Sequence, residues 1–116
     1  MVFYTSVFEM EAELTFVLPD DMRAPPFIFT GYRNSHVHFE GLEEIGSLAQ
    51  FELIDQETLG RGETGRVHAS VLVSDDVPSR VSVEVRPGRH FYLLQNDRCI
   101  AVGTITAARA FRKVEG

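Results

Sequence analysis

Short runs in which apolar and polar residues alternate recur along most of this 116-residue chain, and they limit its fold more than any other feature. A period of two is the pattern of a strand with one buried face. Residues 41–49 have room for a single helical turn, and no longer stretch has a helical period. We therefore expect an all-β protein, with alternating strands at residues 11–18, 47–53, 66–74 and 80–86.

Two further apolar runs, residues 90–95 and 98–105, flank Asn96 and Asp97. Both side-chain types tolerate the positive φ of a two-residue hairpin turn, so this pair predicts a β-hairpin. Short strands at regular spacing without helices between them predict an antiparallel sandwich or a closed barrel. Breakers rich in Gly, Pro and Asp separate the runs at residues 19–21, 25–26, 60–62, 75–78 and 87–88.

Length and composition fit one globular domain over residues 1–116. The chain is 44% hydrophobic and 24% charged, and a domain of this size buries enough surface to fold without disulfides or metal. Cys99 is the single cysteine, which suits a reducing compartment. Glu9, Glu11 and Glu13 interrupt the first residues before a signal peptide or a membrane span can form. These features predict a cytoplasmic protein with no membrane partner.

The net charge of −6 and the pI near 5.1 argue against a protein that neutralises phosphates, and we expect no DNA partner. The charge is uneven along the chain. Residues 1–58 carry eleven acids against Arg23 and Arg33, whereas residues 59–116 carry six acids against nine basic residues. The C-terminal half is therefore the more basic one.

Residues 60–65 fit G-x-G-x-x-G, the pattern of a dinucleotide-binding loop. Such a loop must lead into a helix whose N-terminus meets the pyrophosphate. Residues 66–73 alternate as a strand instead. We therefore interpret the glycines as a turn and expect no nucleotide cofactor.

His36 and His38 share one face of a predicted strand, whose alternate apolar residues face the core. A metal site needs a third ligand, for which His68 and His90 are the candidates. No motif places either of them beside the pair. We interpret the two histidines as surface residues and predict no metal.

The remaining reactive residues do not form a catalytic pattern. Cys99 lies in an apolar strand, where a buried thiol is inert, and Ser35 and His36 are strand neighbours that point to opposite faces. No phosphate-binding G-x-x-x-x-G-K-[ST] loop occurs. The sequence therefore predicts no enzyme. Pairs of acids occur in predicted turns at residues 20–21, 43–44 and 75–76, and we interpret them as solvated loop charges rather than as catalytic acids.

Residues 27–33, Phe-Ile-Phe-Thr-Gly-Tyr-Arg, resemble the start of domain III, the C-terminal barrel of translation elongation factor Tu. In that family an aromatic segment closing on Gly-Tyr-Arg-Pro precedes an alternating strand and a turn that closes on glycine, here residues 36–39 and Gly46. A later segment of the domain is similar to residues 88–103, with identities at Gly88, Phe91, Arg98 and Gly103. The resemblance spans about residues 10–110 and implies a six-stranded antiparallel closed β-barrel.

The resemblance also gives structural roles to the motif residues. Gly31 would have a role in the backbone conformation and Tyr32 a role in side-chain packing. Arg33 or Arg98 would form ion pairs with acids in the loops. Small residues let strands bend or approach as a sheet closes, which suits Gly103, Ala101 and Ala107.

Domain III of elongation factor Tu helps to hold aminoacyl-tRNA and contacts the GTPase domain and the exchange factor. This chain departs from the family pattern where that function is concerned. Asn34 stands in place of the proline, Ser35 in place of the following glutamine, and Asn96 and Asp97 in place of a Gly-Gly pair, so that a carboxylate would repel phosphate. In the loop at residues 22–26 the sole basic residue is Arg23. We therefore expect no tRNA carrier.

We expect instead a non-catalytic, stand-alone barrel that acts as a protein-interaction or regulatory module. We expect no cofactor, and the resemblance implies a link to translation. One form of the module is a mimic or regulator that competes with the parent factor for a partner, and another is an antitoxin-like immunity protein. The partner and the oligomeric state stay open. The candidate interaction surface consists of Tyr32, Arg33, His36, His38, Arg66, Arg80, Arg86 and Arg98.

The alternative is an RNA-binding or tRNA-binding protein that uses the basic C-terminal half. Outward arginines on successive strands, Arg66, Arg80 and Arg86, would form a basic stripe. An enzymatic groove built on His36, His38 and an acid is the least favoured interpretation. The full set of RNA-binding candidates is Arg66, Arg80, Arg86, Arg89, Arg98, Arg109, Arg112 and Lys113.

Overall fold

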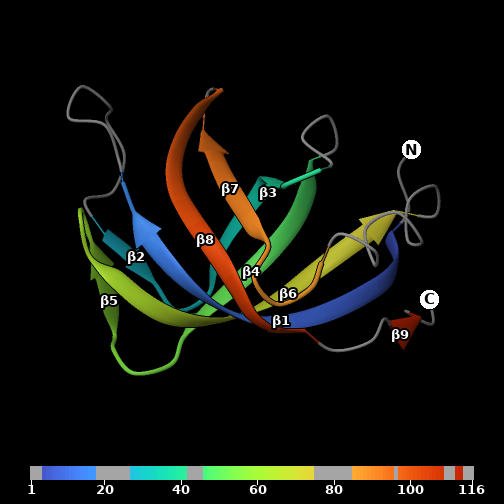
Figure 1. Ribbon diagram of the computed structural model, residues 1–116, viewed down its shortest axis with the longest axis horizontal. Coiled ribbons are helices and arrows are strands. Elements are labelled where there is room, and N and C mark those ends of the chain that lie inside the picture. Colours follow the sequence, from blue (N-terminus) through green and yellow to red (C-terminus); the bar gives the residue numbers. More distant parts are fainter. Residues whose placement is uncertain are drawn as a thin grey trace.

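The computed structural model describes residues 4–17, 27–41, 46–74, 85–95, 97–108 and 112–113. All regular structure in these ranges is β (Figure 1), which confirms the all-β expectation. Within the same ranges no helix has the length and apolar character needed to cross a bilayer. The strands are β1 (Tyr4–Phe16), β2 (Phe27–Phe29), β3 (Tyr32–Phe39), β4 (Ser47–Leu53), β5 (Thr58–Gly60), β6 (Thr64–Ser74), β7 (His90–Gln95), β8 (Arg98–Ala108) and β9 (Arg112–Lys113).

Six strands form a closed antiparallel barrel. They are hydrogen-bonded in the order β6-β4-β3-β7-β8-β1, and a further pairing of β1 with β6 closes the ring. Strand β9 pairs with the first part of β1 outside this ring, and β2 and β5 form a separate two-stranded sheet (Figure 1). The expected six-stranded closed barrel is therefore confirmed.

Strand β1 is longer than the sequence predicts. It begins at Tyr4 rather than at residue 11, because the alternation already holds where Phe8 and Met10 face inward and Glu9 faces outward. It pairs with β6 over nearly its whole length and with β8 over its second half. β1 is thus the strand at which both edges of the curled sheet meet.

Side chains from all six strands fill the interior. Five phenylalanines are at most 2% exposed, and the ring of Phe39 lies 5.9 Å from those of both Phe8 and Phe91. A six-stranded barrel has an interior just wide enough for side chains. Since that space is occupied, any binding function of the described barrel is carried by its outer surface. The most buried large residues are Phe8, Phe16, Phe39, Phe51, Phe91, Met10, Leu14, Leu59, Leu93, Ile100, Ile105 and Val37.

Gly103 makes room for a phenylalanine ring. It pairs with Phe91 across β7 and β8, and a Cβ added at Gly103 would lie only 2.1 Å from the ring atom Cζ of Phe91. Ala101 is also buried. The expectation that small residues let the strands bend or approach is therefore confirmed for Gly103. Ala107 is exposed and lies at the register shift in the pairing of β1 with β8, where Glu11 is opposite Ala107 and Ala12 is opposite Ile105.

The turns agree with the sequence where they are described. Asp97 has a φ of +61° in the hairpin between β7 and β8, as expected, while Asn96 lies outside the described residues. The G-x-G-x-x-G segment contains the turn between β5 and β6, and Gly62 in this turn has a φ of +80°. The backbone N–H of Glu63 donates a hydrogen bond to the carbonyl oxygen of Gly60 at 3.0 Å. It is a turn that leads into a strand, as predicted.

Two local expectations differ from the structure. The strand expected at residues 80–86 falls mostly outside the described residues, but Val85 and Arg86 are described and belong to no strand. Of the possible helical turn at residues 41–49, residues 47–49 are part of β4, and residues 42–45 lie outside the described ranges. The short strands β2, β5 and β9 carry too few residues for a period to be recognised.

We expect Gly103→Ala to destabilise the barrel by about 1–3 kcal/mol, because the new methyl group must displace a packed ring. Urea unfolding measures this change. Combining the substitution with Phe91→Leu removes the clash, so the double variant should lose less stability than the two single losses added together. A Gly103→Ala variant as stable as the parent would contradict the packing described here.

Candidate functional site

The outer surface of β1, β6, β4 and β3 carries two neighbouring hollows. Strand register places its outward residues in rows, for example Glu11, His68 and Glu52 in one row, because His68 pairs with both glutamates. We call this surface the four-strand face. It consists of Glu9, Glu11 and Glu13 of β1, Arg66, His68, Ser70 and Leu72 of β6, Leu48, Gln50 and Glu52 of β4, and Arg33 of β3.

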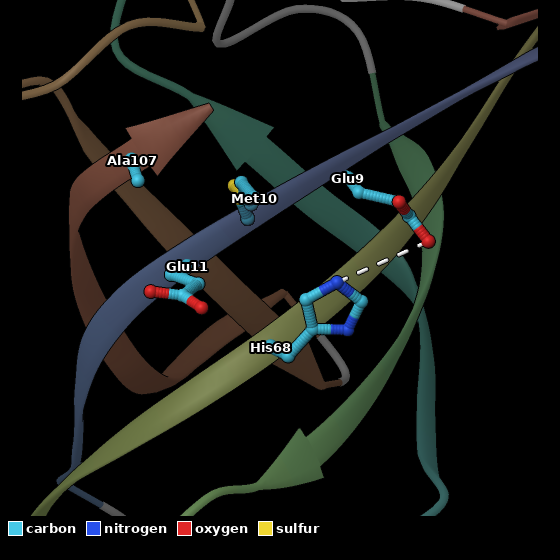
Figure 2. A pocket seen from close by; sticks show the side chains of 5 residues that line it. All are labelled: Glu9, Met10, Glu11, His68 and Ala107. Atoms are coloured by element: carbon cyan, nitrogen blue, oxygen red, sulfur yellow. Dashed lines mark ion pairs between the residues drawn. The ribbon is translucent and has the colours of Figure 1, made fainter. Parts of the chain in front are cut away.

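The first hollow is acidic and has a volume of about 200 Å³. Figure 2 shows His68 between Glu9 and Glu11, with Nε2 of His68 3.9 Å from Oε1 of Glu9. Both side chains of this pair are about one-third exposed or less. Met10 and Ala107 complete the lining. A base is present here, but none of the five lining residues supplies a hydroxyl or a thiol for it to activate.

The second hollow is a groove of about 300 Å³ across β3, β4 and β6. Leu48 and Leu72 are directly opposite one another and half-buried, and they form its apolar floor. Arg33 stands over it, opposite Gln50. Its lining residues are Arg33, Leu48, Ala49, Gln50, Ser70 and Leu72, none of which is an acid.

The basic side chains of this region differ in their partners. Nη1 of Arg66 lies 3.2 Å from Oδ2 of Asp55, and Arg66 is also opposite Glu13. His68 is paired with Glu9. Arg33 is exposed and forms no ion pair with any described residue. The groove therefore combines an apolar floor with the positive charge of Arg33, which is paired with no acid in the described part of the chain.

A β-bulge in β3 decides which residues reach this surface. The pairing of β3 with β4 shifts by one residue between Asn34 and Val37. Before the bulge Arg33 points outward, and after it His36 and His38 point outward while Val37 is buried. A one-residue shift exchanges the two faces of a strand. Without the bulge, Val37 would leave the core.

Asn34 holds the bulge in place. It is only 7% exposed, and its Nδ2 donates to the carbonyl oxygen of Leu94 at 3.3 Å and to the hydroxyl of Tyr32 at 3.1 Å. The backbone N–H of His36 donates to its Oδ1 at 2.6 Å. Asn34 thus has a structural role that the sequence did not reveal.

The predicted surface residues of β3 have different surroundings. Tyr32 is half-buried, with its ring 6.3 Å from that of Phe51. Burial raises the pKa of its phenol, and the hydrogen bond from Asn34 lowers that pKa in part. Tyr32 packs, as the motif implies. His36 is exposed and His38 is half-buried opposite Tyr92. In the described ranges no three His, Cys, Asp or Glu side chains are placed to hold a metal ion.

The predicted arginines do not form a stripe in the described part of the chain. Arg66 lies on β6 beside acids, whereas Arg86 is exposed in the loop before β7, so the expectation that it occupies a neighbouring strand was wrong. Arg80 lies outside the described residues. Arg98 is exposed at the start of β8. Nε of Arg89 lies 3.7 Å from Oε1 of Glu40, which ties the end of β3 to the start of β7.

Sequence reasoning missed the groove. Its floor residues Leu48 and Leu72 occupy outward positions, where the alternation elsewhere places polar residues. A single apolar residue at such a position is ordinary, but two that are contiguous across paired strands form a patch, which is a signal for a contact surface. Gln50 and Ser70 offer no such signal, because polar residues are ordinary at outward positions.

Cys99 corrects another expectation. It is half-buried rather than buried, and its Sγ donates to the carbonyl oxygen of Ala101 at 3.3 Å. Burial raises the pKa of the thiol, although the backbone hydrogen bond lowers it in part.

Comparison of the sequence with protein-family models and with curated proteins found no match. The likeness to domain III of elongation factor Tu therefore rests on the motif residues alone. What it implies about function is a proposal.

We expect Asn34→Ala to cost about 1–3 kcal/mol of unfolding free energy, because it leaves the His36 N–H and the Leu94 carbonyl oxygen without their partner. Urea unfolding measures the loss, and Thr106→Ala, at an exposed position of β8, is the matched control. Equal stability of the two variants would show that Asn34 does not hold the bulge.

A thiol reagent should modify Cys99 several-fold more slowly in the folded protein than in urea. The raised pKa lowers the thiolate fraction at pH 8, and the thiolate is the reactive form. The rate of release of the coloured thiol from a disulfide reagent gives the comparison. Equal rates in both states would contradict the half-buried position.

Proposed function

We propose that this protein is a non-catalytic, stand-alone barrel that docks onto a protein partner through the four-strand face. The observation that carries the proposal is the pair of adjoining hollows on the outside of a barrel whose interior is filled. The backbone of the paired strands is held in place before a partner arrives, so little backbone ordering entropy opposes binding.

The composition of the face suits a protein partner. Half-buried Leu48 and Leu72 lie next to charged rows, and interfaces combine an apolar centre with a polar rim in this way. Ile54, which follows β4, is 39% exposed and bonds through its N–H to the carbonyl oxygen of Arg66. It adds an apolar side chain beside the acidic rows.

The surroundings of the arginines favour a protein over RNA. Arg66 faces Asp55 and Glu13, and Arg89 lies beside Glu40. A nucleic acid on the four-strand face would bring its phosphates against the glutamates of β1 and β4. The net charge of −6 acts in the same direction.

The resemblance to domain III of elongation factor Tu supports a partner from the translation apparatus. In that form of the proposal, the barrel regulates translation by competing with the parent factor for a shared partner. The departures at Asn34 and Ser35 support a role other than tRNA carriage.

The test places a photo-crosslinking phenylalanine derivative at Gln50, in the groove, or at Tyr92, on β7 outside the face. We expect Gln50 to crosslink to one defined protein in cells and Tyr92 not to. Leu72→Asp should abolish that crosslink, and Leu48→Gln should weaken it. Thr106→Asp, a charge added at an exposed position of β8, should leave it unchanged.

Thermal unfolding of each variant separates loss of docking from loss of fold. Crosslinks that are equal from Gln50 and Tyr92, or that persist in both leucine variants, would contradict the proposal. Saturable binding of labelled tRNA at low salt, weakened by Arg66→Ala, would favour the RNA-binding alternative instead.

A further inference from the structure

The groove and the acidic hollow lie side by side but differ in charge. The row that crosses the face runs from Arg33 through Gln50 and Ser70 to Glu9, as the registers of β3, β4, β6 and β1 show. Its positive end stands over the groove, and its negative end belongs to the acidic hollow. The two hollows therefore select different parts of a partner.

We infer, on the basis of the proposed function, that the groove binds a partner segment in which an apolar side chain is followed by a carboxylate. The apolar side chain rests on Leu48 and Leu72, and the carboxylate pairs with Arg33.

Charge complementarity supports this occupant. Arg33 has no ion pair with a described residue, and none of the described residues that line the groove is an acid, so an incoming carboxylate meets the guanidinium without repulsion from those residues. Guanidinium and carboxylate form two parallel hydrogen bonds. Gln50, directly opposite Arg33, offers amide donors to the same anion.

The apolar floor selects against a bare anion. Leu48 and Leu72 are half-buried and opposite one another, so an apolar group that covers them gains free energy by removing their surface from water. A free phosphate offers no such group. A nucleic acid would also have to lay its next phosphates near Glu9 and Glu52.

The mode of recognition follows from the closed sheet. The backbone groups of β4 are bonded to β3 on one edge and to β6 on the other. The groove therefore offers no free strand edge for strand addition, and recognition is by side chains.

Residues Leu48 and Gln50 are two positions apart on β4, a separation of about 7 Å. An extended partner matches it when the apolar and acidic residues are also two positions apart.

The probes are three peptides, acetyl-Ser-Leu-Ser-Glu-Ser-amide and its matched forms with Gln in place of Glu or Ala in place of Leu. Backbone amide resonances of the full chain are followed during titration of each. We expect the first peptide to bind with a dissociation constant of about 1 mM, moving the resonances of Arg33, Leu48, Gln50, Ser70 and Leu72. The Gln and Ala peptides should each bind at least about fivefold more weakly than the Glu peptide.

Arg33→Gln should abolish the difference between the Glu and Gln peptides. Arg86→Gln, which removes an exposed arginine outside the groove, should preserve it. Both positions are exposed, and the amide spectrum of each variant reports whether the fold is retained.

Three results would overturn the inference: no movement of groove resonances with the Glu peptide, equal affinity for the Glu and Gln peptides, or an unchanged preference in Arg33→Gln. A face-specific crosslink from Gln50 alongside any of these results would leave the docking proposal standing and remove only the chemistry assigned to the groove. Specific binding of the Glu peptide without a cellular crosslink from Gln50 would support the chemistry assigned to the groove and contradict the docking proposal.

Discussion

Strand β1 bonds to β6 along one edge and to β8 along the other, and this double pairing closes the barrel. Closure fixes which residues face inward, because the side-chain period of a strand is two. It packs five phenylalanines into the interior and leaves Glu9, Glu11 and Glu13 on the outside. It also leaves no open edge among the six described strands of the ring, so that this ring presents side chains rather than unpaired backbone to its surroundings.

The outer surface then depends on a local irregularity. The bulge that Asn34 holds reverses the phase of β3, which lets Arg33 and His36 both face outward while Val37 and Phe39 remain in the core. Arg33 consequently stands over the groove between β3 and β6, and the glutamates of β1 lie across the same face. The resulting surface is acidic at one side and apolar with a positive charge at the other.

Much of the fold could be predicted because alternation is a local property. It located β4 and β6, and the positive φ of Asp97 bears out the hairpin turn. The start of β1, the bulge at Asn34 and the groove could not be predicted in this way. Each depends on which strands lie side by side and on the register in which they pair, and neither can be derived from a single sequence. Leu48 and Leu72 illustrate this, since they form a groove only because β4 and β6 align them.

Simultaneous pairing of β1 with both neighbours is the central claim, and nuclear Overhauser effects between backbone protons test it most directly. The closed barrel predicts contacts from Ala12 to Val67 of β6 and also to Ile105 of β8 in the same sample. Contacts to only one of these strands would mean an open sheet. The inside and outside of the molecule, and with them the four-strand face, would then have to be assigned anew.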